Sequence, residues 1–209
     1  MIFSPQEKKV LFGAVRQAMY FFLTIGISLL FWKFADIFQR QTFKEFGIIE
    51  NMQLEFLFAS AFLFFLDGLI LKKHAALLFF LASLCALASC RELDSFFDLK
   101  LPVISWKFGF LFPLSALIYI YKNRKDFRVS FFHFLETPAF NLMCTAVLIA
   151  LALAQVFGHR VFIENVMGTE KYARPVRRIL EEGSEAIAYF LILLSAIECY
   201  FDFSRKKED

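Results

Sequence analysis

The sequence predicts an all-α fold: a polytopic membrane protein built as a six-transmembrane-helix bundle with no soluble domain. Two observations predict it. Of the 209 residues, 59% are hydrophobic and 31 are phenylalanine, well above the apolar share of a soluble domain. The apolar residues also form six runs, each near the length that crosses a ~30 Å hydrocarbon core as a helix. Charged residues collect in short blocks between these runs.

Residues 1–209 are expected to form a single transmembrane domain. The runs are too long and too continuous for barrel strands, so we interpret each as a helix. The expected spans are 13–32, 54–71, 75–90, 106–121, 140–157 and 186–203. Lys8 and Lys9 precede the first run, but it has membrane length and lacks a small-x-small cleavage site, so we interpret it as a retained span.

Prolines and short turns predict how the spans are connected. Pro113 predicts a kink in the fourth span, and Pro138 predicts the start of the fifth. Pro175 predicts the first turn of a helix that continues unbroken into the sixth span. The turn at 72–74 is so short that the second and third spans must be antiparallel neighbours. Residues 131–135 follow a basic run and are expected to lie flat on the membrane surface.

Charge density in the turns predicts the orientation. Alternating spans place both chain ends and the turns at 72–74 and 121–128 on one side. With Arg16 set aside, eleven Lys and Arg residues fall on each side, so the count alone does not decide. Those on the first side form compact clusters beside the spans, and the positive-inside rule therefore predicts cytoplasmic termini. Without an Asn-x-Ser/Thr site, the chain agrees with a multi-pass protein of a bacterial inner (cell) membrane.

Three ionisable residues form an inner layer within the spans, near the predicted cytoplasmic side: Arg16, Asp67 and Glu198. An intramembrane charge costs ~2.5–3.5 kcal/mol near the bilayer centre, so mutual pairing is the least costly arrangement. Two interpretations stay open: a structural salt bridge, or a relay for protons or cations.

An outer layer at the opposite ends of the spans contains more ionisable residues. Its members are Glu55, Arg91, Glu92, Asp94, His159, Glu181, Glu182 and Glu185. Glu181 and Glu185 are four residues apart, so they share a helix face and repel each other unless a cation lies between them. Arg91 is the expected partner, because its guanidinium stays charged and binds carboxylates bidentately. Solvated charges, a structural Arg91–carboxylate contact and a working site all remain open.

A faint internal repeat links the second and sixth spans. An offset of 131 residues aligns Glu50 with Glu181 and Asp67 with Glu198. Repeats of this kind build many membrane transporters. Chance similarity between two apolar helices is the alternative.

Several classes of function are disfavoured. The sequence has no Walker loop, dinucleotide fingerprint, Gly-x-Ser-x-Gly elbow or haem-attachment motif, so no cofactor is indicated. Carboxylates near His159 suit a divalent metal, but His-x-x-x-His and Glu-x-x-His spacings are absent, and we predict no metal site. The net charge of +3 is spread over short blocks, which disfavours a nucleic-acid surface.

Three functions stay open. The first is a small integral membrane transporter or channel-like protein with an outer-facing carboxylate/arginine site, from which Asp67 and Glu198 continue a polar path inward. The second is a membrane-embedded, metal-dependent enzyme that uses Glu92, Asp94, His159 and the glutamates of the sixth span. The third is an accessory or assembly subunit of a membrane complex, whose charges are structural. The expected partners are the lipid bilayer and other membrane proteins or further copies of the chain.

Overall fold

The structure is a computed structural model that describes residues 4–38, 47–94, 97, 105–167 and 170–205. Every regular element in these ranges is a helix, as the sequence predicts. The four longest are α1 (Pro5–Phe38), α2 (Ile48–Ile70), α3 (Ala75–Glu92) and α10 (Glu170–Arg205). The shorter ones are η2 (Lys72–His74), η3 (Trp106–Phe110), α5 (Leu111–Lys122), α6 (Arg124–Leu135), α7 (Pro138–Leu148), the π-helical turn η4 (Ile149–Leu153), α8 (Ala154–Gly158) and α9 (Arg160–Met167).

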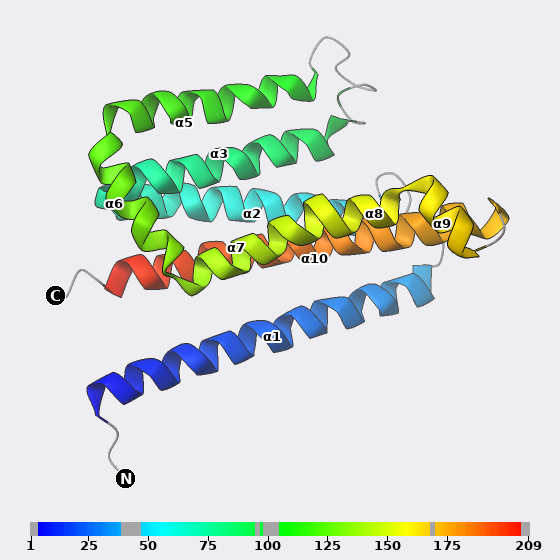
Figure 1. The fold of residues 1–209 in the computed structure, drawn as a ribbon, viewed down its shortest axis with the longest axis horizontal. Helices are drawn as coiled ribbons and strands as arrows, with labels where there is room; N and C mark the ends of the chain where they lie inside the picture. The colour runs from blue at the N-terminus through cyan, green and yellow to red at the C-terminus, as the bar shows by residue number, and fades with distance from the viewer. Residues whose placement is uncertain (1–3, 39–46, 95–96, 98–104, 168–169, 206–209) are drawn as a thin grey trace.

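The helices form an elongated bundle in which successive long elements alternate in direction (Figure 1). The second and third spans are antiparallel neighbours joined by η2, as expected from the short turn. The start of α1, the end of α10, η2 and α6 lie at one end of the bundle, which we call the basic end. The opposite end, where α2 and α10 begin and α3 ends, is called the acidic end. Which side of a membrane each end faces stays a prediction.

Five segments are long and apolar enough to cross a membrane: Val10–Phe31, Ile48–Ile70, Lys72–Glu92, Pro138–Gly158 and Val176–Ser204. They correspond to five of the six expected spans and support a membrane protein in general. The expected span at 106–121 is helical but divided into the 3₁₀ turn η3 and the 12-residue α5. Together they have 17 residues, fewer than the 21 or more of each segment above. The six-span count therefore stays a prediction.

Pro113 does not kink a long helix as expected, because it lies in the first turn of α5, where a missing N–H costs little. Pro138 opens α7 as expected, and the Thr137 side chain caps that helix by accepting a hydrogen bond from the Phe140 N–H. Pro175 lies inside α10 rather than in its first turn. The helix is nevertheless unbroken into the sixth expected span.

Two helices begin earlier than the hydropathy predicts. Ser4 and Glu7 form a capping box at the start of α1: the Ser4 N–H donates to the Glu7 carboxylate (2.7 Å), and the Glu7 N–H donates to Ser4 Oγ (3.2 Å). These bonds hold the pKa of the Glu7 carboxyl below its usual range. Helix α2 begins at Ile48 rather than at 54, which brings the polar Glu50 and Gln53 into the helix.

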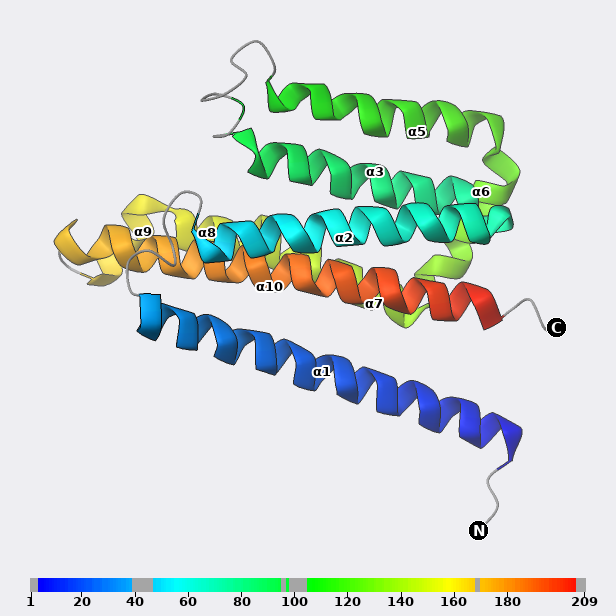
Figure 2. The ribbon, with the colours of Figure 1, turned by 180° about the vertical axis from the view of Figure 1, so that it is seen from behind.

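The core of the bundle is a seam between α2 and α10, which run in the same direction (Figures 1 and 2). Along both helices the seam positions alternate spacings of four and three residues, the pattern of parallel coiled coils. They are Gln53, Leu57, Ser60, Phe64 and Asp67 on α2 with Leu71 directly after it, and Glu185, Tyr189, Ile192, Ala196, Cys199 and Phe203 on α10. All are buried except Ile192, which is half-buried.

The two stripes of the seam are related by an offset of 132 residues. Leu57 packs with Tyr189, and Phe64 packs in one cluster with Ala196 and Cys199. The packing register therefore differs by one residue from the 131-residue repeat read from the sequence. One residue turns a helix by about 100°. Asp67 accordingly lies level with Cys199, and not with Glu198.

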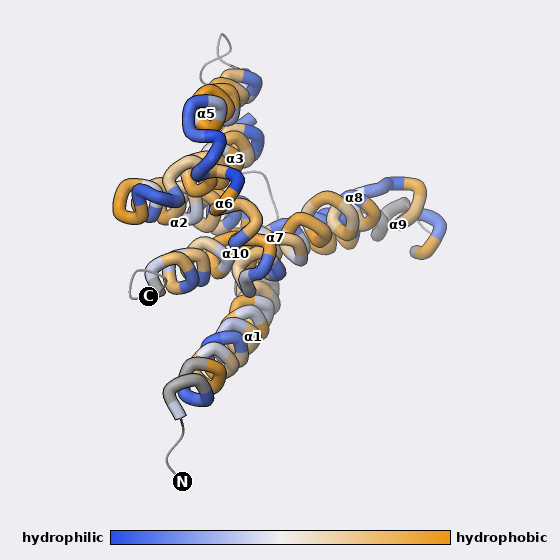
Figure 3. The backbone as a smooth tube through the Cα atoms, turned by 60° about the vertical axis from the view of Figure 1, so that its left-hand side comes forward, coloured by the Kyte–Doolittle hydropathy of each residue, from blue (hydrophilic) through white to orange (hydrophobic). Residues whose placement is uncertain are grey.

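The apolar surface of the bundle faces outward, where a membrane would place lipid. Large hydrophobic side chains are exposed on α1, α2, α5 and the α7–α8 segment, including Phe12 (72%), Phe62 (60%) and Leu151 (64%). Figure 3 shows apolar residues along these helices and a hydrophilic stretch where α5 passes into α6. Helix α1 stands furthest apart, with 6% of its apolar segment buried and its main contact on α10.

Close packing of η3 on α3 generates the first prediction. A Cβ on Gly109 would lie 2.9 Å from Cys90 Cβ and 3.0 Å from Leu87 Cδ1, too close for η3 to keep its place. Gly109→Ala is therefore expected to cost about 1–3 kcal/mol and to lower the unfolding temperature of the protein in detergent. Gly26→Ala is the matched control, because a Cβ there meets no atom within 4 Å. Equal unfolding temperatures for the two variants would contradict this packing.

Candidate functional site

The inner layer contains an ion-pair network that joins α1 to α10. The Arg16 guanidinium forms a salt bridge with Glu198, and Tyr20 donates a 2.7 Å hydrogen bond to the other oxygen of that carboxylate. Asp202 Oδ1 lies 3.6 Å from Arg16 Nη2. The guanidinium carbon also lies 5.0 Å from the centre of the Phe201 ring, within cation–π range. Glu198 is fully buried, so its charge is balanced inside the protein rather than by solvent.

Sequence reasoning named Arg16 and Glu198 but missed Tyr20 and Asp202. A signal was available. Tyr20 is four residues after Arg16, and Asp202 is four residues after Glu198, so each pair shares a helix face.

Asp67, the third expected member of the inner layer, lies apart from this network. It sits on the seam, 5% exposed, and its carboxylate is close enough to Cys199 to interact electrostatically. Its Oδ2 atom is buried without a hydrogen-bond partner among the described residues. A polar atom in that position is costly unless another group satisfies it.

The outer layer converges at the acidic end, where α2, α3 and α10 meet. Tyr189 donates a 2.7 Å hydrogen bond to Glu92. Gln53 donates through its amide nitrogen to the backbone oxygen of Glu182 (2.9 Å) and to its carboxylate (3.1 Å). We call this group the acidic-end cluster. Its members are Glu50, Gln53, Glu92, Glu182, Glu185 and Tyr189, with Glu50 close enough to interact electrostatically with Glu92 and Glu182.

Glu185 is the least satisfied residue of the acidic-end cluster. Its side chain is 7% exposed and forms no hydrogen bond or ion pair that involves the described residues. The carboxylates of Glu92 and Glu182 lie close enough to repel it, and Arg91 is close enough to attract it. Gln53 Oε1 is also buried with no hydrogen-bond partner. The cluster thus presents two buried acceptors that lack a donor in the described part of the chain.

Arg91 does not occupy the place expected for it. It is exposed and forms no ion pair in the described ranges, so it is not clamped between Glu181 and Glu185. Arg91 instead lies at a cavity of about 200 Å³ between α2, α3, η4 and α10, together with Tyr189. Glu55 lies on the exposed face of α2, away from the seam.

The remaining outer residues are spread around the acidic end. Asp94 is half-buried just after α3, and His159 is exposed between α8 and α9. Glu181 turns toward α8, where its carboxylate oxygen lies 2.5 Å from the position that a Cβ on Gly158 would take. Among the described residues, no three His, Cys, Asp or Glu side chains lie together as metal ligands would.

Gln53 and Tyr189 are the residues of the acidic-end cluster that sequence reasoning missed. Gln53, Ser60 and Asp67 recur every seven residues along α2, which is the spacing of one buried helix face. Tyr189 follows Glu185 by four residues. Both spacings were readable from the sequence once α2 was extended to include Gln53.

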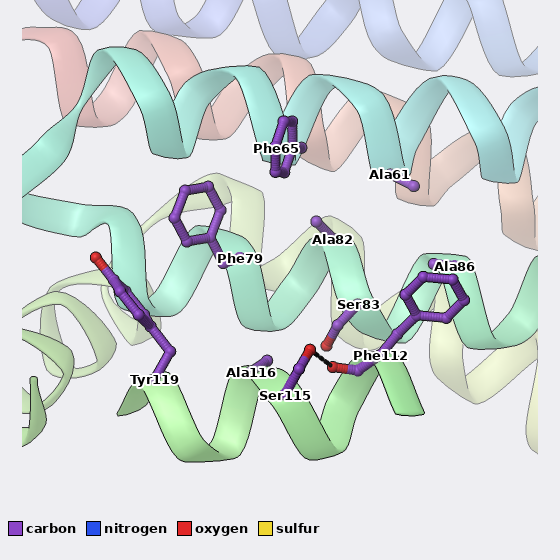
Figure 4. Close-up of a pocket in the computed structure, with 10 residues that line it drawn as sticks. All are labelled: Ala61, Phe65, Phe79, Ala82, Ser83, Ala86, Phe112, Ser115, Ala116 and Tyr119. Atoms are coloured by element: carbon purple, nitrogen blue, oxygen red, sulfur yellow. Dashed lines mark hydrogen bonds between the residues drawn. The ribbon is translucent and has the colours of Figure 1, made fainter. Parts of the chain in front are cut away.

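A second cavity, of about 450 Å³, lies between α2, α3 and α5 (Figure 4). Alanine and phenylalanine side chains form most of its wall. The hydroxyls of Ser83 and Ser115 donate to backbone oxygens of their own helices, at Phe80 and Phe112. No charged residue lines this cavity, so it suits an apolar chain and is not the candidate polar site.

No protein-family model, curated protein or solved structure matches the chain. The candidate site is therefore assigned from its own geometry.

The α1–α10 network generates the second prediction. Glu198→Ala leaves the partly buried Arg16 without its main partner, and loss of one member of a buried pair typically costs about 3–5 kcal/mol. Glu198→Ala is expected to lower the unfolding temperature strongly, and Arg16→Met in the same chain is expected to restore part of the loss. A double-mutant cycle by thermal unfolding in detergent measures the coupling.

The exposed pair Arg160–Glu164 is the matched control for that cycle, because its two residues are also bridged but lie on the surface. Its coupling is expected to stay below about 1 kcal/mol. Equal coupling energies in the two pairs would refute a special role for the α1–α10 network.

Proposed function

We propose that the chain is a small integral membrane transporter or channel-like protein, and that the acidic-end cluster binds the cation or proton that it moves. Glu185 carries the proposal. A buried carboxylate flanked by two others is stabilised by a proton or by a bound cation. The orphan oxygen of Gln53 adds a neutral acceptor beside it. Carboxylate and amide oxygens together suit a small hard cation or the N–H groups of an ammonium.

The location in a membrane is supported by the five long apolar helices and by their exposed phenylalanine and leucine side chains. A solvated bundle would leave these faces in contact with water, whereas lipid covers them at no cost.

The seam suggests how a charge would pass between the two ends of the bundle. Polar residues recur along α2 at Gln53, Ser60 and Asp67, about 10.5 Å apart at 1.5 Å per residue. Leu57 and Phe64 lie between them and are fully buried, so the seam is closed in this conformation. Passage therefore requires α2 and α10 to shift relative to each other, as elements of alternating-access transporters do.

The third prediction tests Glu185 directly. In proteoliposomes loaded with a pH-sensitive or cation-sensitive dye, the wild-type protein is expected to dissipate an imposed gradient. Glu185→Gln keeps the shape of the side chain but removes its charge, and is expected to reduce the flux at least tenfold. Glu55→Gln is the matched control, because Glu55 carries the same group on the exposed face of α2. Flux that is equal in all three proteins, or absent from the wild type, counts against transport.

We further propose that the basic end faces the cytoplasm of a bacterial inner membrane. The support is the compact clustering of Lys and Arg around η2, α6 and the chain ends.

As a fourth prediction, Lys125→Cys is expected to react with a membrane-impermeant maleimide only after the cells are opened, whereas His159→Cys at the acidic end is expected to react in intact cells. Both side chains are exposed, so accessibility within the fold is matched. The reverse labelling pattern would invert the orientation.

One observation favours a second candidate, an accessory or assembly subunit. Helix α1 has 6% of its apolar segment buried and touches mainly α10, which leaves most of its surface for another membrane protein or a second copy. Co-purification of a stoichiometric partner, together with full function of Glu185→Gln, would favour this role. The metal-dependent enzyme gains no support, since no ligand set converges among the described side chains.

A further inference from the structure

A pocket of about 470 Å³ opens at the basic end, between η2, α6 and the last turn of α10. It is separate from the acidic-end cluster, which lies at the other end of the bundle. The residues that line it are Ile70, Leu71, Lys72, Lys73, His74, Val129, His133 and Phe203.

The lining divides into a basic part and an apolar part. Lys72 and Lys73 carry positive charges and are exposed. Two histidines also line the pocket, and none of the lining residues is a carboxylate. Ile70, Val129 and Phe203 supply apolar surface beside the charges. Cationic groups next to an apolar wall fit an amphiphile with an anionic head, whereas a purely ionic ligand would gain nothing from the wall.

The pocket is held in shape by contacts among three elements. His74 Nδ1 lies 2.8 Å from Ser130 Oγ on α6, and its ring stacks on Phe203 of α10 with centroids 4.3 Å apart. The His133 ring meets the same phenylalanine edge-on at 5.1 Å. Ser130 is itself buried. The backbone of η2, which presents Lys72 and Lys73, is therefore fixed against both α6 and α10 before any ligand binds.

Helix α6, which forms one wall of the pocket, has the features of a helix at a membrane surface. It runs across the direction of the long helices, between α5 and α7 (Figure 1). Val129 and Phe132 are exposed at 59% and 57%, and Lys125 and Arg128 are exposed on the same short helix. A crosswise helix with exposed apolar and basic side chains suits the membrane interface, where lipid headgroups lie. The surface position expected for 131–135 stays a prediction.

We propose that this pocket binds one anionic phospholipid, with its phosphate at Lys72 and Lys73 and an acyl chain against Ile70 and Val129. Basic pockets between membrane helices on the cytoplasmic side bind anionic headgroups in this way. The proposal rests on the membrane location proposed above but not on transport. The binding site is independent of Glu185 and of any flux.

The test measures lipid binding to the purified full-length protein in detergent by native mass spectrometry, with phosphatidylglycerol and phosphatidylcholine as probes. The wild type is expected to retain phosphatidylglycerol preferentially. Each lysine near a phosphate contributes enough that Lys72→Gln/Lys73→Gln is expected to weaken binding roughly tenfold to thirtyfold. Lys122→Gln/Lys125→Gln removes the same charge from exposed positions at the same end, outside the pocket, and is expected to change binding less than about threefold.

Val129→Trp provides a second variant that leaves all charges in place and fills the apolar part of the pocket. It is expected to weaken phosphatidylglycerol binding while the protein stays folded, because Val129 is exposed. If the double lysine variant fails to fold, Val129→Trp alone tests whether the pocket binds the lipid.

Three outcomes would overturn the proposal. An equal loss of phosphatidylglycerol binding in the two double lysine variants would show only that the basic end attracts anionic lipid in general. Displacement of the lipid by millimolar inorganic phosphate, with Val129→Trp still binding phosphatidylglycerol, would assign the pocket to free phosphate. Equal retention of the two lipids by the wild type would remove the site altogether. A failure of the membrane location is seen separately, as failure of the protein to float with vesicles.

Discussion

The packing of α2 against α10 is the constraint on which the rest of the bundle depends. In lipid, helices gain little from burying apolar surface, so close contact and hydrogen bonds must hold them together. The matched spacing of the two stripes provides that contact from Gln53 to Leu71 and from Glu185 to Phe203. Other elements pack on this pair or, as α5 does, on α3. Helix α3 follows α2 through η2, and α7 is tied to α10 by a 2.7 Å hydrogen bond from Ser195 Oγ to the Ala139 carbonyl.

The buried polar groups differ in how well the protein satisfies them. Glu198 receives a guanidinium and a phenol from α1, so its charge is balanced and the network serves cohesion. Glu185 and Asp67 lie on the seam itself, and neither carboxylate has an ion pair within the described part of the chain. Residues of one chemical kind thus have separate roles. Glu198, whose charge is balanced, holds α1 against α10. Glu185 and Asp67, which lack such a partner, lie on the contact between α2 and α10.

Length and hydropathy predict the helical class and five of the spans, because both depend on local composition. Other features depend on rotation and register, which composition does not contain. Helix α2 begins several residues before its apolar run. Gln53 lies in that earlier part, and its amide donates a hydrogen bond to Glu182, which is far away in the sequence. Arg91 is exposed and lies at the cavity beside Tyr189 rather than between Glu181 and Glu185, a placement that depends on how α3 is rotated. The offset of 132 rather than 131 follows from side-chain packing. The seven-residue recurrence of Gln53, Ser60 and Asp67, by contrast, was readable from the sequence in advance.

The attachment of α1 has a consequence for how the chain is assembled during synthesis. Arg16 and its partner Glu198 are separated by 182 positions. The ribosome therefore makes the guanidinium long before the glutamate exists. In a membrane, that cation would stay near the headgroups until α10 arrives, by extending its side chain. The ion pair that fastens α1 to α10 can form only after residue 198 has been made.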